Sequence, residues 1–288
     1  MRNSATDVSG TNRFAFGENW ARFLHDLDDE RILRAEQSLC DMLNVKTLQG
    51  QRFLDVGSGS GLFSLAARRL GAEVYSFDYD PRSVDCTMEV RRRYMGDDPG
   101  WTVTRGSVLD RKYLDSLGQW DVVYAWGVLH HTGDLWSALE NVIHLVREGG
   151  TLFLSIYNDQ GRASKYWHWI KKTYNRLPKG TRGLVLFPVL ARLWGPQTIR
   201  DFIAGRPFYT WRNYSRITLR GMSPWWDVVD WVGGFPFEVA SPEQVFTFYR
   251  HRGFRLEQMT TCAGRHGCNQ FVFVRLALPD SRSAEVLS

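Results

Sequence analysis

The feature that most constrains the fold is a short apolar run that leads directly into closely spaced glycines. Residues 53–56 form the run, in the manner of a parallel strand that is buried on both faces. The glycines follow at alternating positions: Gly57, Gly59 and Gly61. They let the backbone approach a ligand closely, and the helical stripe that begins at Leu62 presents unpaired N–H groups. The stretch therefore predicts a ligand-binding strand–turn–helix unit, with Asp55 at the carboxyl end of the strand.

The spacing of these glycines distinguishes between ligand classes. A dinucleotide fingerprint reads G-x-G-x-x-G, whereas residues 57–61 read G-x-G-x-G with Asp55 two positions earlier. A second predicted strand, residues 73–77, ends at Asp78, where a carboxylate can accept hydrogen bonds from both ribose hydroxyls. Together these residues resemble the class I S-adenosylmethionine (SAM) methyltransferases, which implies SAM as the cofactor.

The resemblance also implies which residues contact SAM. Asp78 holds the ribose and Tyr79 packs beside the adenine, while the turn after a third strand, 101–105, reaches the adenine edge. In that turn Ser107 stands where the family often has an acid, so this contact is assigned less firmly, and the Val108 backbone and Asp110 are its further candidates. An N-terminal helical lid would bring residues to the methionine end. The expected cofactor set is Asp55, Gly57, Ser58, Gly59, Gly61, Asp78, Tyr79, Ser107, Val108, Trp126, Trp20 and Arg22.

Strand and helix patterns alternate up to residue 157, which is typical of a parallel sheet with helical crossovers. The fourth crossover helix is predicted at 135–146, closed by residues 148–150, with the fifth strand at 151–157. A helix and a strand pair return from Ser241 onward. The resemblance implies an α/β fold: a Rossmann-like, doubly wound, mostly parallel seven-stranded sheet with an antiparallel last strand.

The break in this alternation predicts the domain organisation. We expect an N-terminal tail and helical lid at 1–48 and a SAM-binding core at 49–157 and 240–278. A substrate-binding cap is expected at 158–239, and a tail at 279–288.

Methyl transfer from a sulfonium is an in-line displacement, so the protein mainly aligns the acceptor and excludes water. A hydroxyl or ammonium acceptor also needs a base, and His is the usual choice near neutral pH. His131 and His130, which follow the fourth strand, are therefore candidates, although His131 is often structural in similar enzymes. Tyr157 and Asp227 are further candidates. Asp227 belongs to an aromatic segment that forms a pocket wall with a proton acceptor, a cation-binding face, or the apolar seam that joins cap to core.

No set of residues has convincing metal-ligand spacing, so we expect no metal. His130, His131, Asp227 and Asp230 are nevertheless placed so that they could converge on a divalent ion.

The inserted segment is basic and aromatic, with only Asp159 and Asp201 as acids between residues 158 and 220. Such a surface suits an anionic small molecule, an acidic carrier protein or a nucleic acid. Its apolar stretch 183–194 suits contact with a membrane surface or with a second subunit, so a homodimer is one of the expected possibilities. Nucleic acid is not favoured, because residues 126–129 lack the Pro-Pro motif of amine methyltransferases acting on DNA bases.

The segment Leu129-His130-His131 best fits the small-molecule type of the family, such as ubiquinone-biosynthesis and natural-product enzymes. We therefore expect methyl transfer from SAM to a hydroxyl, or less readily an amine or carbon, of a small anionic or carrier-linked acceptor. The alternatives are methylation of RNA or protein through the basic cap, and a SAM-fold protein with other chemistry. The absence of a signal pattern, of a long apolar run and of C-x-x-C spacing predicts a cytoplasmic protein without a transmembrane segment.

Overall fold

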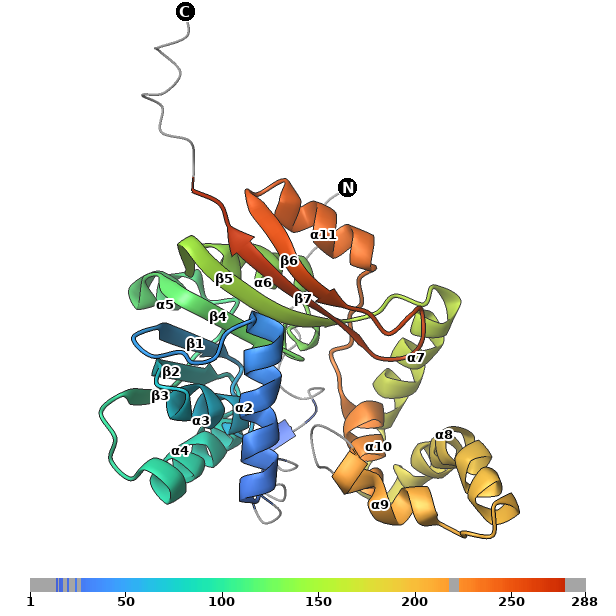
Figure 1. The fold of residues 1–288 in the computed structure, drawn as a ribbon. Helices are drawn as coiled ribbons and strands as arrows, with labels where there is room; N and C mark the ends of the chain where they lie inside the picture. Colours follow the sequence, from blue (N-terminus) through green and yellow to red (C-terminus); the bar gives the residue numbers. More distant parts are fainter. Residues whose placement is uncertain are drawn as a thin grey trace, which may run out of the picture.

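The computed structural model describes residues 14, 16, 17, 20, 24, 27–217 and 223–277. Its strands form one seven-stranded sheet in the order β3-β2-β1-β4-β5-β7-β6 (Figure 1). The strands are β1 (Arg52–Val56), β2 (Glu73–Asp78), β3 (Trp101–Arg105), β4 (Trp120–Trp126), β5 (Val146–Tyr157), β6 (Phe254–Thr260) and β7 (Cys268–Arg275). The first five pair in parallel, whereas β7 runs antiparallel to both β5 and β6. The predicted doubly wound sheet with an antiparallel last strand is confirmed.

Helices cover both faces of the sheet because successive strand residues point to opposite sides. In β1, Phe53 packs with helices α2 to α4, whereas Leu54 and Val56 pack with α5, α6 and α11. The six helices are α2 (Asp29–Leu43), α3 (Leu62–Arg69), α4 (Pro81–Met95), α5 (Arg111–Leu117), α6 (Leu135–Ile143) and α11 (Pro242–Arg250). The apolar clusters on the two faces fix the sheet between the helices, and the carboxyl ends of its parallel strands lie along one edge.

Side-chain caps explain where several of these helices begin. Asp28 accepts a hydrogen bond from the Arg31 N–H at 2.8 Å and starts α2. Asp80 caps α4, and Pro81 occupies the first helical position, where its missing N–H costs nothing. Ser241 forms a reciprocal capping box with Gln244 at the start of α11.

Two boundaries differ from the prediction. Helix α6 ends at Ile143 rather than at residue 146, and β5 begins at Val146, so residues 148–150 lie within the strand. Val146 pairs with Trp120, and the register between β4 and β5 then shifts before Val122. This pairing is a tertiary contact, which the local glycine pattern does not reveal. The short helix α5 was also not predicted.

The segment after β5 is helical. It comprises α7 (Arg162–Arg176), the 3₁₀ helix η2 (Lys179–Thr181), α8 (Gly183–Ile203), α9 (Tyr209–Ile217) and α10 (Pro224–Gly233). Its apolar side chains form a cluster of their own, which includes Trp167, Ile170, Val189 and Val228. Figure 1 shows α8 and α9 projecting away from the sheet, whereas α7 and α10 lie next to it.

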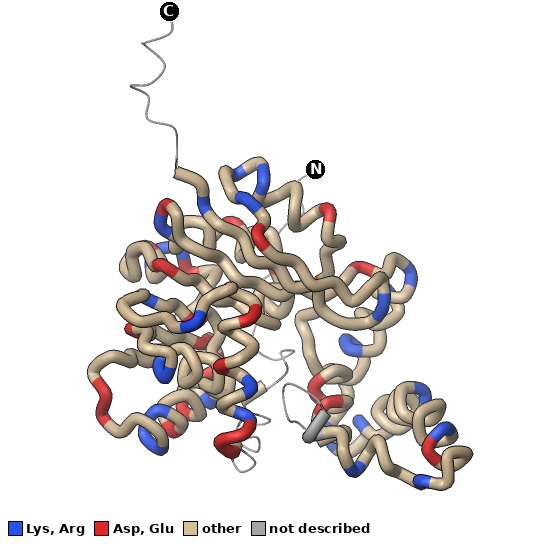
Figure 2. The backbone as a smooth tube through the Cα atoms, in the orientation of Figure 1, with Lys and Arg blue, Asp and Glu red and all other residues tan. Residues whose placement is uncertain are grey.

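The cations of this segment lie mostly on its outer surface (Figure 2). Arg162, Lys165, Arg192 and Arg200 are exposed, whereas Lys171 is fully buried. None of the helices among the described residues is both long and apolar enough to cross a membrane.

Candidate active site

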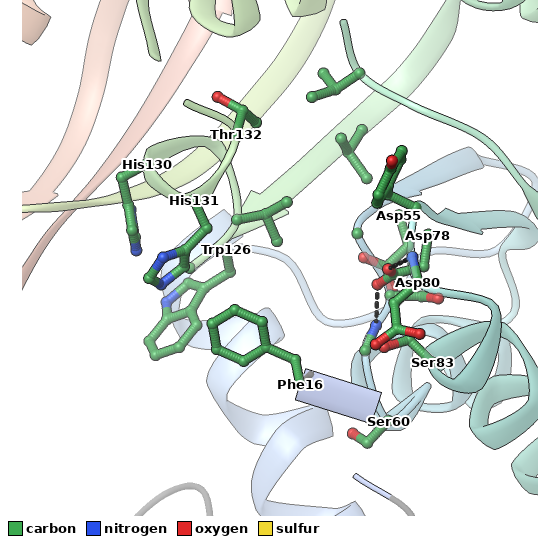
Figure 3. Close-up of a pocket in the computed structure, with 18 of the residues that line it drawn as sticks. Phe16, Asp55, Ser60, Asp78, Asp80, Ser83, Trp126, His130, His131 and Thr132 are labelled. Atoms are coloured by element: carbon green, nitrogen blue, oxygen red, sulfur yellow. Dashed lines mark hydrogen bonds between the residues drawn. The ribbon is translucent and has the colours of Figure 1, made fainter. Parts of the chain in front are cut away.

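A cavity of about 500 Å³ lies at the carboxyl ends of the parallel strands. We call it the main cavity. It is lined by the turns that follow β1, β2, β3 and β4, by the end of β5, and by parts of the N-terminal segment, the α10 region and the β6–β7 hairpin. Open α/β sheets bind their ligands at this edge. Figure 3 shows the acids of the β1 and β2 ends on one side of the pocket and the two histidines on the other.

The glycine turn fits closely around its neighbours. Gly59 has a φ of +57°, and a Cβ added there would lie 3.0 Å from Nε1 of Trp20. A Cβ on Gly57 would lie 2.4 Å from a methyl carbon of Val128. Both positions therefore require glycine, for backbone conformation and for space.

Asp78 connects the glycine turn to the end of β2. One carboxylate oxygen accepts the Gly59 N–H at 3.0 Å, and the other accepts the Asp80 N–H at 2.9 Å. Burial raises the pKa of Asp78 to about 6, an effect that these hydrogen bonds oppose. Each oxygen has a further acceptor position, so the residue fits a vicinal diol such as a ribose.

Asp55 lies below the cavity in the core of the sheet. It is 2 % exposed, and the Ser64 hydroxyl donates a hydrogen bond to it. The hydroxyl oxygens of Ser64 and Ser76 are 2.8 Å apart, and that of Ser76 also accepts a hydrogen bond from the indole N–H of Trp101. Burial raises the pKa of Asp55 to about 7, against the effect of the Ser64 bond and with a contribution from nearby Asp78.

The residues expected at the adenine line one side of the main cavity. Tyr79 is 51 % exposed, and Ser107 accepts a hydrogen bond from the Leu109 N–H at 3.2 Å, which shapes the turn after β3. Val108 is buried, and its carbonyl accepts from the side chain of Asn141. The Ser58 hydroxyl lies 2.8 Å from that of Thr87 in α4.

Three described residues of the N-terminal segment, Phe14, Phe16 and Trp20, line the cavity. Trp20 lies against Gly59, the ring of Phe16 lies 4.9 Å from that of His131, and the Gly17 N–H donates to Asp80 at 3.0 Å. Arg22, expected at the methionine end, lies outside the described residues.

The two histidines have opposite hydrogen-bonding roles at Nδ1. Nδ1 of His131 lies 2.6 Å from the carbonyl oxygen of Pro236, which can only accept, so Nδ1 carries the proton. Nδ1 of His130 instead accepts the Tyr157 N–H at 3.4 Å. His131 thus keeps Nε2 as its basic nitrogen, while fully buried His130 holds the end of β5 in place.

Tyr157 and Trp126 complete this side of the cavity. The ring of Tyr157 lies 3.9 Å from that of His130 and 5.4 Å from that of His131. The Trp126 indole donates to Gln270 of β7 at 3.1 Å.

The position of Asp227 corrects one expectation. It does not line the main cavity, although Asp230, one helical turn further along α10, does. Asp227 faces α9, where the Tyr214 hydroxyl donates to it at 2.6 Å. Within the described part of the chain, no group of three His, Cys, Asp or Glu side chains is arranged to hold a metal ion.

Sequence reasoning missed several lining residues, among them Phe235, His266, Cys268 and Gln270. The last three come from the β6–β7 hairpin, which was predicted only as a structural turn. The antiparallel pairing of β7 with β5 brings this hairpin beside Tyr157.

A model of a methyltransferase domain matches residues 18–184 of the chain, which is more than half of its 288 residues. The chain belongs to the methyltransferase domain family. It is a SAM-dependent methyltransferase, as the glycine turn and Asp78 predicted.

Two curated relatives are ubiquinone biosynthesis O-methyltransferases. The one from Xanthomonas campestris pv. campestris (strain B100) is 31 % identical over 179 residues, which cover 60 % of this chain and 73 % of the relative. The one from Sinorhizobium fredii (strain NBRC 101917 / NGR234) is 26 % identical over 188 residues, covering 61 % and 74 %.

Solved structures share the fold. Magnesium protoporphyrin IX methyltransferase from Synechocystis PCC 6803, with bound SAM, has a TM-score of 0.52 at 13 % identity, covering 96 % of this chain and 98 % of that one. An O-methyltransferase family protein from Burkholderia thailandensis also has a TM-score of 0.52, at 12 % identity, covering 94 % and 67 %.

Proposed function

We propose that this methyltransferase acts on a hydroxyl group of a small acceptor that binds in the main cavity beside His131 and Tyr157. The observation that carries the proposal is the hydrogen bond between Nδ1 of His131 and the Pro236 carbonyl. It leaves Nε2 as the basic nitrogen of a cavity-lining imidazole, as a hydroxyl acceptor requires. The names of the curated relatives, which are O-methyltransferases of ubiquinone biosynthesis, support a hydroxyl acceptor and small-molecule biosynthesis.

Bound SAM supplies a methyl group on an electrophilic sulfonium, and the protein's part is to orient and to exclude water. In this proposal the glycine turn and Asp78 hold the nucleoside. His131 accepts the acceptor's hydroxyl proton at Nε2, and His130 acts as a positioning residue through the Tyr157 backbone. The aromatic rings of Phe16, Trp126 and Tyr157 limit the entry of water.

The charge of the cavity bears on the acceptor. Its described lining includes Asp55, Asp78, Asp80 and Asp230 but no Lys or Arg. We therefore propose that the reacting part of the acceptor is not itself anionic. If the acceptor is linked to an acidic carrier, the exposed cations of α7 to α9 are the surface that the carrier would contact. We propose residues 158–239 as a cap that encloses the acceptor, because residues 230, 231, 235 and 236 line the cavity.

Release of S-adenosylhomocysteine (SAH) in the presence of SAM and a panel of small phenols, alcohols and amines tests the proposal. We expect turnover with hydroxyl acceptors, and mass spectrometry of the product should place the new methyl group on oxygen. Methylation confined to nitrogen, or to RNA or protein substrates, would contradict it.

A further inference from the structure

A second cavity, of about 270 Å³, adjoins the main cavity on its cap side. We call it the cap cavity. Four residues line both spaces, namely Tyr157, Asp230, Trp231 and His266. The other lining residues are Leu193, Trp194, Tyr214, Asp227 and Val228, which come from α8, α9 and α10. None of them belongs to the expected SAM-binding set, so the cap cavity lies beyond the part of the site that the cofactor uses.

Aromatic rings form much of its wall. The ring of Trp194 lies 5.0 Å from that of Tyr214 in an edge-to-face arrangement, and Trp231 lies 5.2 Å from Tyr157. Aromatic faces carry negative electrostatic potential and attract cations, most strongly in the case of Trp.

The same wall carries a carboxylate that has no counter-charge among the described residues. Asp227 is half-buried and accepts a hydrogen bond from Tyr214 at 2.6 Å through one oxygen. No Lys, Arg or His nitrogen of the described chain lies within 4.0 Å of it. A partly desolvated carboxylate in such a position is stabilised when a cation binds beside it.

The protein already places one lysine amino group next to this wall. Nζ of fully buried Lys171 lies 3.9 Å from the centre of the Trp231 ring and 4.7 Å from that of Phe237, and it donates to the Trp231 carbonyl. Lys171 interacts electrostatically with Asp230 but lines neither cavity. In its charged form Lys171 therefore compensates Asp230, whereas Asp227 has no such partner among the described residues.

We propose that the cap cavity is a subsite for a positively charged ammonium group of the acceptor, with Asp227 as its counter-charge. The hydroxyl end of the same molecule then lies in the main cavity beside His131. This inference rests on the proposed function, since it concerns the acceptor of that reaction. A neutral polyhydroxylated group would satisfy the hydrogen bonds of Asp227 but would leave its charge uncompensated, which is why the ammonium is favoured.

Three phenols of similar size test the subsite in calorimetric titrations of the full chain saturated with SAH. Tyramine carries an ammonium group, 4-ethylphenol is neutral and 3-(4-hydroxyphenyl)propionate is an anion. We expect tyramine to bind about tenfold more tightly than 4-ethylphenol, with the anion weakest. Asp227→Asn should bring tyramine and 4-ethylphenol to within about twofold of each other.

Asp159→Asn is the matched control, because it removes one negative charge at the start of the insertion, outside both cavities. It should keep the preference of the unmodified protein. Tyr214→Phe removes the hydroxyl that donates to Asp227 but keeps the carboxylate, so it should keep most of the preference for tyramine over 4-ethylphenol. It thereby distinguishes loss of the Asp227 charge from disturbance of the surrounding structure.

Measuring SAH affinity distinguishes a failure of this inference from a failure of the proposed function. Failure of the unmodified protein to bind SAH would contradict the cofactor site itself. If SAH binds but tyramine shows no advantage over 4-ethylphenol, or does not bind at about 10 mM, the ammonium subsite is wrong and the hydroxyl-methylation proposal is unaffected. A preference for tyramine that survives Asp227→Asn would equally overturn the role of Asp227.

Discussion

Nδ1 of His131 donates a hydrogen bond to the carbonyl oxygen of Pro236 at 2.6 Å, so the loop after β4 and the segment after α10 fix one imidazole tautomer together. The contact joins the core, which fits the cofactor, to the segment proposed as the cap. The proposed base, which belongs to the core, is thus oriented by the part of the chain that we expect to recognise the acceptor. His131 and its partner Pro236 both line the main cavity.

We predict that His131→Gln lowers kcat about 100-fold or more with the true acceptor, because a positioned base contributes about 10²–10⁴-fold to such a step. SAH affinity should change little. Steady-state rates and calorimetric titration with SAH would measure the two effects. His144→Gln is the control, since His144 is exposed and lines neither cavity. Equal loss in both variants would argue for a general destabilisation instead.

We predict that Asp78→Ala weakens SAM binding about 10- to 100-fold, because hydrogen bonds to a charged group contribute about 1.5–3 kcal/mol each. Isothermal titration would measure it, with exposed Asp97→Ala as the control. The pKa of Asp78 is raised to about 6 in the protein without ligand. Because SAM is expected to prefer the ionised carboxylate, its affinity should fall as the pH drops below about 6. Unchanged affinity for Asp78→Ala would remove the central assumption of the site.

Gly59→Ala should weaken cofactor binding, because it introduces both backbone strain and a close contact with Trp20. Gly50→Ala introduces only the strain, so comparing the two variants separates these effects. Gly59 has a φ of +57° and its added Cβ would lie 3.0 Å from Trp20, whereas Gly50 has a φ of +74° with open space around it. Both alanine variants should lose about 1 kcal/mol of stability through backbone strain. Only Gly59→Ala should also weaken SAM binding, as titration would show. A similar loss of affinity in Gly50→Ala would mean that strain alone accounts for the effect.

Most of the residues predicted to hold the cofactor follow from local sequence patterns and line the main cavity. Gly57, Gly59 and Gly61 fix a turn, and Asp78 follows its strand directly, so spacing along the chain is enough. Residues 148–150 were misassigned because the pairing of Val146 with Trp120 is a contact between strands.

The acceptor half depends on long-range contacts. His266 reaches the cavity through the antiparallel pairing of β7 with β5, and Asp230 rather than Asp227 lines it because of how α10 packs on the core. No local pattern distinguishes two acids one turn apart on the same helix. The cations that dominate the composition of the insertion proved to lie mainly on its surface, where charged side chains remain hydrated.

Lys171 gives a prediction about how the cap is stabilised. Burial lowers its pKa to about 7 in the folded protein from an ordinary value of 10.5, so between these two pH values the unfolded chain binds more protons than the folded one. The free energy of unfolding should therefore rise with pH in that window, by up to about 1.4 kcal/mol per pH unit from this residue. Lys171→Met, which fills a similar volume without a charge, should lack that part of the slope. Chemical unfolding at several pH values between 7 and 10 measures it, with exposed Lys165→Met as the control. Parallel pH curves for the unmodified protein and Lys171→Met would show that Lys171 stays fully charged in the fold, held by Asp230 more strongly than burial disfavours it.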